Sequence, residues 1–341
     1  MKPGVFLVDD SAVARMMVKR VVDEAGVFEV VGHAASADQA IQRVSGVRPD
    51  LVLLDIEMPG MSGIDAIPHI MHECGNVPIL VLSSHCSENA EASIRAMAMG
   101  ASDTLLKPTG GQSGARFGCL LRETMLRLLE DAGGPSDDVY QIGATVEHPV
   151  RCLAIGASTG GVHALNALLA ALPAEHDMPI LIAQHLPADF MPFFARQIEA
   201  SSGRTTVIAE DGEPLRAGKI YIAPGNFHLA IAGNGPDTRI ALQPRGGSGP
   251  CPSVDPLFAS VGVCFGTDAV GVMLTGMGRD GAQGAATLVE YGGSVVAQDR
   301  GSAVIWGMPG AVVEAGIAHS IAPPAMLAAQ IAMRARTFGW N

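Results

Sequence analysis

The chain has 341 residues, a length that suits about two domains of ordinary size. It is 48% hydrophobic with a mean hydropathy of +0.29, yet no run of about 18 apolar residues is uninterrupted, so we expect no transmembrane span and no direct membrane insertion. The formal net charge of −12 argues against binding to phosphates over the whole chain, so we expect no nucleic acid partner.

The first residues and the cysteines favour a cytoplasmic protein. The start MKPGVFLVDDSA sets two acidic residues directly after the first apolar run, which is wrong for a signal peptide. The six cysteines form no C-x-x-C pair, so neither a zinc site nor a disulfide framework is indicated. We therefore predict a cytoplasmic location with reduced thiols.

In the first 130 residues, short apolar runs alternate with amphipathic segments. The runs that read as strands are residues 5–8, 28–31, 51–54, 78–82 and 103–106, and a fifth helix is expected at 121–131. Strands without polar alternation, separated by helices, predict a parallel sheet that is covered on both faces. The Gly-, Pro- and Asp-rich residues 129–149 show no apolar period and predict a linker.

Polar residues stand at the carboxyl ends of these predicted strands. Asp9 and Asp10 follow the first strand, and Asp55 follows the third. If the strand order is 2-1-3-4-5, these three carboxylates converge, and such a cluster favours Mg²⁺ as a hard cation with oxygen ligands. The fourth strand ends at Ser83, and Lys107 follows the fifth. Each acid taken alone could instead cap the helix that follows it.

The motifs VDDS, LLDIEMPGMSG and LLKP, at these spacings, resemble the receiver domain of two-component response regulators over about residues 3–125. The resemblance implies phosphorylation of Asp55 by a histidine kinase. It further implies Mg²⁺ held by Asp9, Asp10, Asp55 and the Glu57 backbone carbonyl, with Ser83 as the switch hydroxyl and Lys107 as the phosphate partner. The chain departs from the pattern at Thr104, where receivers usually carry an aromatic switch residue.

A second alternating series follows the linker. The predicted strands are residues 151–158, 178–185, 204–210, 219–225, 269–276 and 293–299, and the predicted helices are residues 159–171, 187–200, 254–264, 280–291 and 323–336. The expected fold class is therefore α/β, with two doubly wound parallel-sheet domains. We expect a flavodoxin-like domain over residues 1–128, and over residues 150–341 a Rossmann-like α/β domain with some antiparallel strands.

The second series opens on a G-x-S-x-G motif, in which Ser158 lies on a sharp turn between a strand and a helix. Such a serine is a candidate nucleophile, although it could also be a helix cap, or the glycine-rich turn could hold a nucleotide phosphate. His185 at the end of the next strand is the best-placed base, and Asp280 after a later strand is the best-placed acid. Weaker candidates are His163, His228, Asp255 and Asp299.

The chain order Ser, His, Asp differs from that of the α/β-hydrolases. The segments AIGASTGG, LIAQH, IYIAPGNFHL, PSVDPLF, LTGMGRDGA and WGMP closely resemble the catalytic domain of chemotaxis protein-glutamate methylesterases, the CheB family, over about residues 150–335. The resemblance implies demethylation of glutamates and deamidation of glutamines on methyl-accepting chemoreceptors by Ser158, His185 and Asp280, with no cofactor in this domain. It also implies that the unphosphorylated receiver covers the catalytic cleft.

Backbone amides near Thr159 and in the turn at Met277 and Gly278 are the expected oxyanion donors.

The alternative to an enzyme is a receiver fused to a non-catalytic, ligand- or nucleotide-binding α/β output domain. A DNA-binding output is disfavoured, because residues 150–341 carry a net charge of only −3 and no basic recognition helix.

Overall fold

The structure is a computed structural model that describes residues 2–75, 77–83, 89–107, 114–130, 148–247 and 249–334. The chain divides into two compact units, Met1–Ala132 and Gly133–Asn341. Most of the predicted linker, residues 131–147, lies outside the described residues. None of the described helices combines the length and the apolar composition needed to cross a bilayer.

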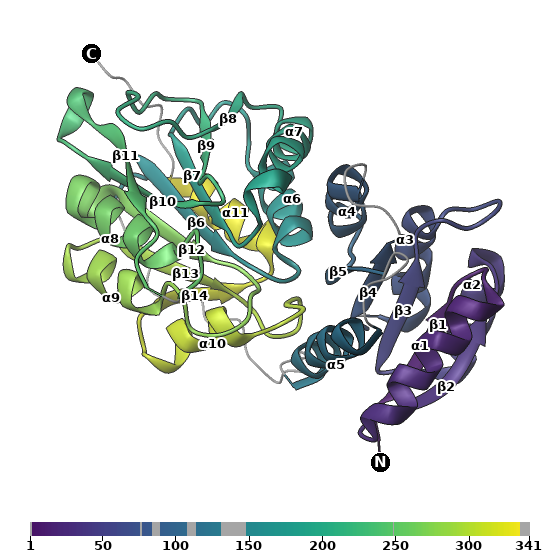
Figure 1. The fold of residues 1–341 in the computed structure, drawn as a ribbon. Coiled ribbons are helices and arrows are strands. Elements are labelled where there is room, and N and C mark those ends of the chain that lie inside the picture. The colour runs from purple at the N-terminus through teal and green to yellow at the C-terminus, as the bar shows by residue number, and fades with distance from the viewer. Residues whose placement is uncertain are drawn as a thin grey trace. The chain divides into compact units, whose positions relative to one another are not determined.

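The first unit is a parallel sheet with the strand order β2-β1-β3-β4-β5 (Figure 1). Its elements are β1 (Gly4–Val8), α1 (Ala12–Ala25), β2 (Glu29–Ala34), α2 (Ala37–Val47), β3 (Leu51–Asp55), α3 (Gly63–Cys74), β4 (Ile79–Ser83), α4 (Asn89–Ala98), β5 (Asp103–Leu106) and α5 (Gly114–Glu130). All five predicted strands are confirmed. The last helix begins earlier than predicted, at Gly114.

The central strands of this unit are buried along their whole length, which explains why their sequences lack polar alternation. Strand β1 pairs with β3 so that Val8 lies opposite Leu54. Asp9 follows the last residue of β1, and Asp55 is the last residue of β3, so the two carboxylates lie at the same edge of the sheet. The strand order thus sets up the acidic cluster that the sequence predicts.

The second unit is built on a parallel sheet with the strand order β14-β13-β12-β6-β7-β9-β8, accompanied by an antiparallel pair, β10 and β11. Its elements are β6 (Cys152–Ala157), α6 (Gly161–Ala171), β7 (Ile180–Gln184), η1 (Ala188–Phe190), α7 (Met191–Ser202), β8 (Thr206–Ile208), β9 (Ile220–Ile222), β10 (Phe227–Ala232), η2 (Gly235–Asp237), β11 (Arg239–Pro244), α8 (Val254–Phe265), η3 (Gly266–Asp268), β12 (Ala269–Met273), α9 (Ala282–Glu290), β13 (Ser294–Gln298), α10 (Gly307–Glu314), β14 (Ala318–Ala322) and α11 (Pro324–Arg334), where η marks short 3-10 helices.

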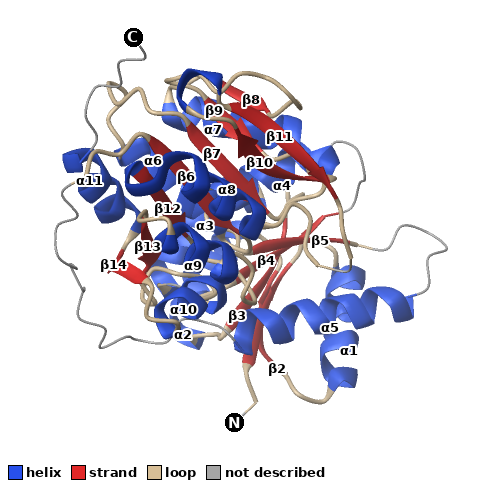
Figure 2. Ribbon diagram, turned by 90° about the vertical axis from the view of Figure 1, so that its left-hand side faces the viewer, coloured by secondary structure: helices blue, strands red, loops and turns tan. Residues whose placement is uncertain are grey.

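Helices cover both faces of this larger sheet (Figures 1 and 2). On one face α6 packs against α7 and α11, and on the other α8 packs against α9 and the antiparallel strand β10. The sheet order makes β6 the neighbour of both β7 and β12. The residues that follow these three strands therefore share one edge of the sheet, where ligands bind in open α/β folds.

Candidate active site and acidic cluster

The candidate nucleophile and base follow paired residues of neighbouring strands. Strands β6 and β7 are in register with Ala157 opposite Gln184, so Ser158 and His185 each stand one residue beyond this pair. The His185 amide donates to the Ala157 carbonyl at 3.1 Å, which holds the candidate base against the end of β6, the strand that precedes Ser158. Both side chains are half-buried.

Backbone contacts hold Ser158 on its turn. Its amide donates to the Thr275 carbonyl at 3.0 Å, and its carbonyl accepts from the Gly161 amide and from Gln184 Nε2, each at 2.8 Å. A Cβ atom at Gly161 would collide with Gln184 Oε1, so this position requires glycine. Gly160 has a φ of +75°, in the left-handed region that glycine tolerates best. The two glycines that follow Thr159 are thus explained by packing and by turn conformation.

The candidate base and acid are in direct contact. His185 Nε2 lies 2.8 Å from Asp280 Oδ2, and their side chains are 17% and 9% exposed. Because Nε2 is engaged by the carboxylate, Nδ1 is the ring nitrogen left to accept a proton from a nucleophile. Among the described residues the Ser158 hydroxyl makes no hydrogen bond to His185, a contact that often tightens only with substrate bound.

Asp280 receives hydrogen bonds on both of its oxygens. Val254 N donates to Oδ2 at 2.7 Å, and Ser253 Oγ donates to Oδ1 at 2.6 Å. Burial by itself raises the pKa of Asp280, but the hydrogen bonds from His185, Ser253 and Val254 outweigh it and hold that pKa below its usual value. The carboxylate is therefore held ionised beside the imidazole.

The chain segments that hold the expected oxyanion donors pass near Ser158. A Cβ atom built on Gly276 would lie only 2.8 Å from Ser158 Cβ, so the chain leading into Met277 and Gly278 passes close to the nucleophile. The Thr159 carbonyl accepts from the Thr275 hydroxyl at 3.0 Å. The role of the Thr159, Met277 and Gly278 amides as oxyanion donors stays a prediction.

The weaker candidates from the sequence have other positions. His163 is exposed on α6, and Asp255 lies in the first turn of α8, where it accepts from Gly284 N at 2.7 Å. Asp299 accepts from the Ser302 hydroxyl. His228 Nδ1 accepts from Ser253 N at 2.9 Å.

Sequence reasoning missed Ser253, whose only local signal is its position before an apolar helix.

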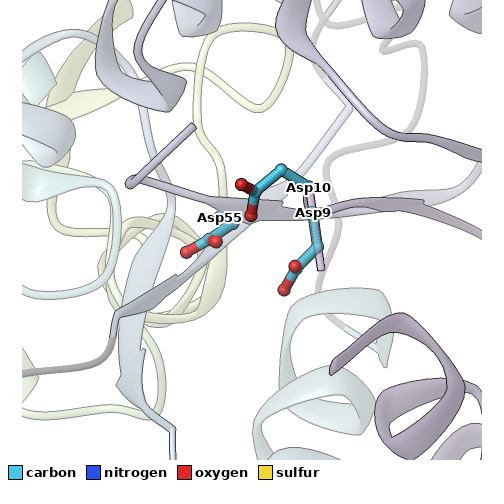
Figure 3. A group of neighbouring side chains, drawn as sticks. All are labelled: Asp9, Asp10 and Asp55. Carbon is cyan, nitrogen blue, oxygen red and sulfur yellow. The ribbon is translucent and has the colours of Figure 1, made fainter. Parts of the chain in front are cut away.

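The acidic cluster of the first unit comprises Asp9, Asp10 and Asp55 (Figure 3), with ligand oxygens that lie within 4.8 Å of one another. Asp9 and Asp55 are 4% exposed, whereas Asp10 is exposed. Lys107 Nζ lies 2.7 Å from Asp9 Oδ2 and 2.9 Å from Asp55 Oδ1. Burial raises the pKa of Asp55, and the nearby Lys107 only partly opposes this.

These residues fit a magnesium ion. The donor set consists of carboxylate oxygens, which Mg²⁺ prefers, and one lysine leaves a surplus of negative charge among three acids. Glu57 is exposed just beyond Asp55, and its amide hydrogen-bonds to the Asp55 carboxylate.

Ser83, the last residue of β4, is 2% exposed. Thr104 pairs with Val81 in the sheet and is half-buried.

Residues 153–331, more than half of the chain, match the family of CheB methylesterase domains. The chain belongs to the CheB methylesterase family. Residues 5–113 of this CheB-family chain match the response regulator receiver domain, so both units have a family assignment. The α/β fold class predicted from the sequence is confirmed.

Curated relatives of this CheB-family chain align over nearly its whole length. A protein of Caulobacter vibrioides, named protein-glutamate methylesterase/protein-glutamine glutaminase 2, is 36% identical over 98% of this chain and 99% of its own. A protein of Nocardioides with the same name, without the numeral, is 38% identical over 97% of this chain and 96% of its own. The crystal structure of the Thermotoga maritima CheB methylesterase catalytic domain is 33% identical, with a TM-score of 0.52 over 54% of this chain and 98% of that one.

Proposed function

We propose that this chain is a protein-glutamate methylesterase and protein-glutamine glutaminase that acts on chemoreceptors. The observation that carries the proposal is the convergence of Ser158, His185 and Asp280 after three neighbouring strands, with the His185–Asp280 hydrogen bond at 2.8 Å. The printed names of the relatives support the same pair of activities. Residues 150–341 would form the catalytic domain and residues 1–128 the receiver, working in the cytoplasm.

The geometry supports an acyl-enzyme mechanism. His185 Nδ1 takes the proton from Ser158 Oγ as this oxygen attacks the γ-carbonyl of a methylated glutamate, and Asp280 stabilises the resulting imidazolium. Backbone amides near Thr159 and in the Met277–Gly278 turn donate to the oxyanion. Methanol leaves with the proton from His185. Water, deprotonated by the same nitrogen, then attacks the acyl carbon; the bond to Ser158 Oγ breaks, Ser158 recovers its proton from His185, and the receptor carboxylate is released. From a glutamine, ammonia leaves instead of methanol.

We assign the acidic cluster to phosphorylation control of this activity. Asp55 would take a phosphoryl group from a histidine kinase, with Lys107 pairing to its oxygens and Ser83 hydrogen-bonding to them. Asp9, Asp10, Asp55 and the Glu57 carbonyl would hold Mg²⁺, which when bound neutralises the charge of the incoming group. Phosphorylation would relieve a block of the active site by the receiver. Thr104 makes an aromatic switch at this position unavailable to that coupling.

The hydrolytic activity is tested with methylated chemoreceptors in membranes. Incubation with the full chain is expected to remove methyl groups and convert glutamines to glutamates, as followed by mass spectrometry, and Ser158→Ala is expected to do neither. A fluorophosphonate should label wild-type protein stoichiometrically and spare both Ser158→Ala and His185→Ala. Retention of esterase activity by Ser158→Ala would refute the assignment of the nucleophile.

Regulation is tested separately, with acetyl phosphate as the phosphodonor in the presence of Mg²⁺. We expect acetyl phosphate to raise the demethylation rate of wild-type protein and to leave Asp55→Asn at its basal rate. Equal stimulation of the two proteins would exclude Asp55 as the regulatory site without affecting the assignment of the triad.

A further inference from the structure

Ser253 stands immediately before helix α8, and its side chain is directed at the candidate acid. Its hydroxyl donates to Asp280 Oδ1 at 2.6 Å and also accepts from Asp255 N at 3.2 Å, so the residue caps the helix and contacts the triad at once. Residues 253 and 280 come from the beginning of α8 and from the turn before α9, two helices that pack together. The contact is therefore tertiary, and it links the helix layer to the catalytic edge of the sheet.

The hydroxyl has a distinct effect on the carboxylate of Asp280. The other two donors, His185 Nε2 and Val254 N, both bind Oδ2. The Cβ–Cγ torsion of a carboxylate has broad preferences, and turning about this bond moves both oxygens together. Among the described residues Ser253 Oγ alone binds Oδ1, so this bond adds a separate restraint that keeps Oδ2 on His185 Nε2.

A second histidine holds Ser253 in turn. His228 lies on β10, is 9% exposed, and accepts a hydrogen bond at Nδ1 from Ser253 N at 2.9 Å. The strand carrying it pairs with β11, with His228 opposite Gln243. The Ser253 backbone is thereby anchored to the antiparallel pair, outside the sheet that carries Ser158 and His185. The amide and the hydroxyl of Ser253 thus both have fixed partners.

We propose that Ser253 is a positioning residue for the hydrolytic reaction, orienting the Asp280 carboxylate so that Oδ2 holds His185 Nε2 and leaves Nδ1 as the base. His228 serves this arrangement by fixing the Ser253 backbone. The inference rests on the proposed function, since it assigns a role within the same triad. Ser253 itself touches none of the reacting atoms.

The test compares Ser253→Ala with Ser253→Thr in the full chain, using methylated receptor membranes and rates measured from pH 5 to 9. Loss of one hydrogen bond to an ionised group should lower kcat by about 10-fold to 100-fold with little change in KM. The carboxylate, no longer hydrogen-bonded at Oδ1, would carry more of its negative charge on Oδ2, beside His185. We therefore expect the rise of kcat/KM with pH to move to higher pH in Ser253→Ala, and expect Ser253→Thr to restore both properties.

The matched control is Ser260→Ala, on the same helix. The Ser260 hydroxyl bonds Ile231 N at 3.1 Å and the Leu257 carbonyl at 3.0 Å and does not contact Asp280, so this variant should keep wild-type kcat and pH dependence. Thermal unfolding of each variant reports the structural cost of losing a hydroxyl.

The outcomes separate the inference from the proposed function. Unchanged kcat in Ser253→Ala, or a loss equal at every pH with no displaced pH profile, would overturn the positioning role and leave Ser253 as a helix cap. Wild-type protein without activity on the receptor would instead count against the proposed function.

Discussion

The charge of Asp280 can be separated from its shape by the substitution Asp280→Asn. The new amide group can face Ser253, whose hydroxyl can turn to accept, while the remaining carbonyl oxygen still accepts from His185 Nε2 and Val254 N. The hydrogen-bond pattern is then kept, and only the negative charge beside the imidazole is removed. Any change in rate reports the electrostatic stabilisation of the imidazolium that forms when Ser158 loses its proton.

The distance between the two groups sets the size of the effect. Two unit charges at the 2.8 Å separation of His185 Nε2 and Asp280 Oδ2 interact by about 6 kcal/mol at an effective dielectric constant of about 20. This dielectric constant suits the site because the two side chains are only 17% and 9% exposed. At 1.36 kcal/mol for each factor of ten, we expect kcat to fall by about 10⁴-fold.

The assay is demethylation of receptor membranes by the full chain under single-turnover conditions, so that the chemical step is observed. Asp255→Asn is the matched control, because Asp255 lies close by, accepts from the backbone of Gly284 at 2.7 Å and does not bond His185. Burial raises the pKa of Asp255, so a neutral replacement should be tolerated, with kcat within a few-fold of wild type. A loss below about 10-fold in Asp280→Asn, with the fold intact, would refute the electrostatic role.

Three further results are expected. Replacing a chelator with Mg²⁺ should raise the free energy of unfolding of the first unit by about 2.7 kcal/mol when the Mg²⁺ concentration is 100 times its Kd. Asp55→Asn should show no such increase. Calorimetry of the two proteins measures the difference. Gly276→Ala should lower kcat more than 10-fold, because its Cβ would lie 2.8 Å from Ser158 Cβ and closer still to Met308 Sδ, whereas Gly246→Ala, with open space around it, should match wild type in the same assay. Folding lowers the pKa of Asp280, so the ionised carboxylate stabilises the fold fully at a pH above its unfolded-state pKa of about 3.9. This stabilisation is lost as the pH falls through the pKa of the folded state. The difference in Tm between wild type and Asp280→Asn should therefore narrow from pH 6 to pH 3.

Most of both sheets could be predicted from the sequence because their strands are buried on both faces. Continuous apolar runs such as residues 51–54 and 152–157 are readable without knowledge of their neighbours. The strand β14 was missed since its sequence AHSIA breaks the apolar run, and α10 was missed because Gly and Pro interrupt its helical pattern. The sequence predicts some antiparallel strands in this domain but does not locate them. The pair β10 and β11 lies outside the main sheet, so the alternation of strands and helices gives no position for it.

The proximity of the proposed nucleophile and base could be predicted because parallel strands bring the residues that follow them to one edge of the sheet. Ser158 and His185 follow strands that pair residue by residue, so their proximity needs only the strand order. Ser253 could not be predicted in the same way. Its hydroxyl meets Asp280 across a separation of 27 residues, and the contact depends on how α8 packs against the turn before α9. A helix cap and a positioning residue have the same local sequence signal.

Two buried aspartates of this chain illustrate how surroundings can assign a role. Asp55 is buried, and the Lys107 ammonium group and the Glu57 amide only partly oppose the effect of burial, so its pKa is raised and the carboxylate suits a site completed by a cation. Asp280 is also buried, but three donors on two oxygens lower its pKa and keep it ionised without a metal. The hydrogen-bond donors that the fold directs at each carboxylate therefore separate Asp55, the proposed phosphoacceptor, from Asp280, the proposed acid of the triad.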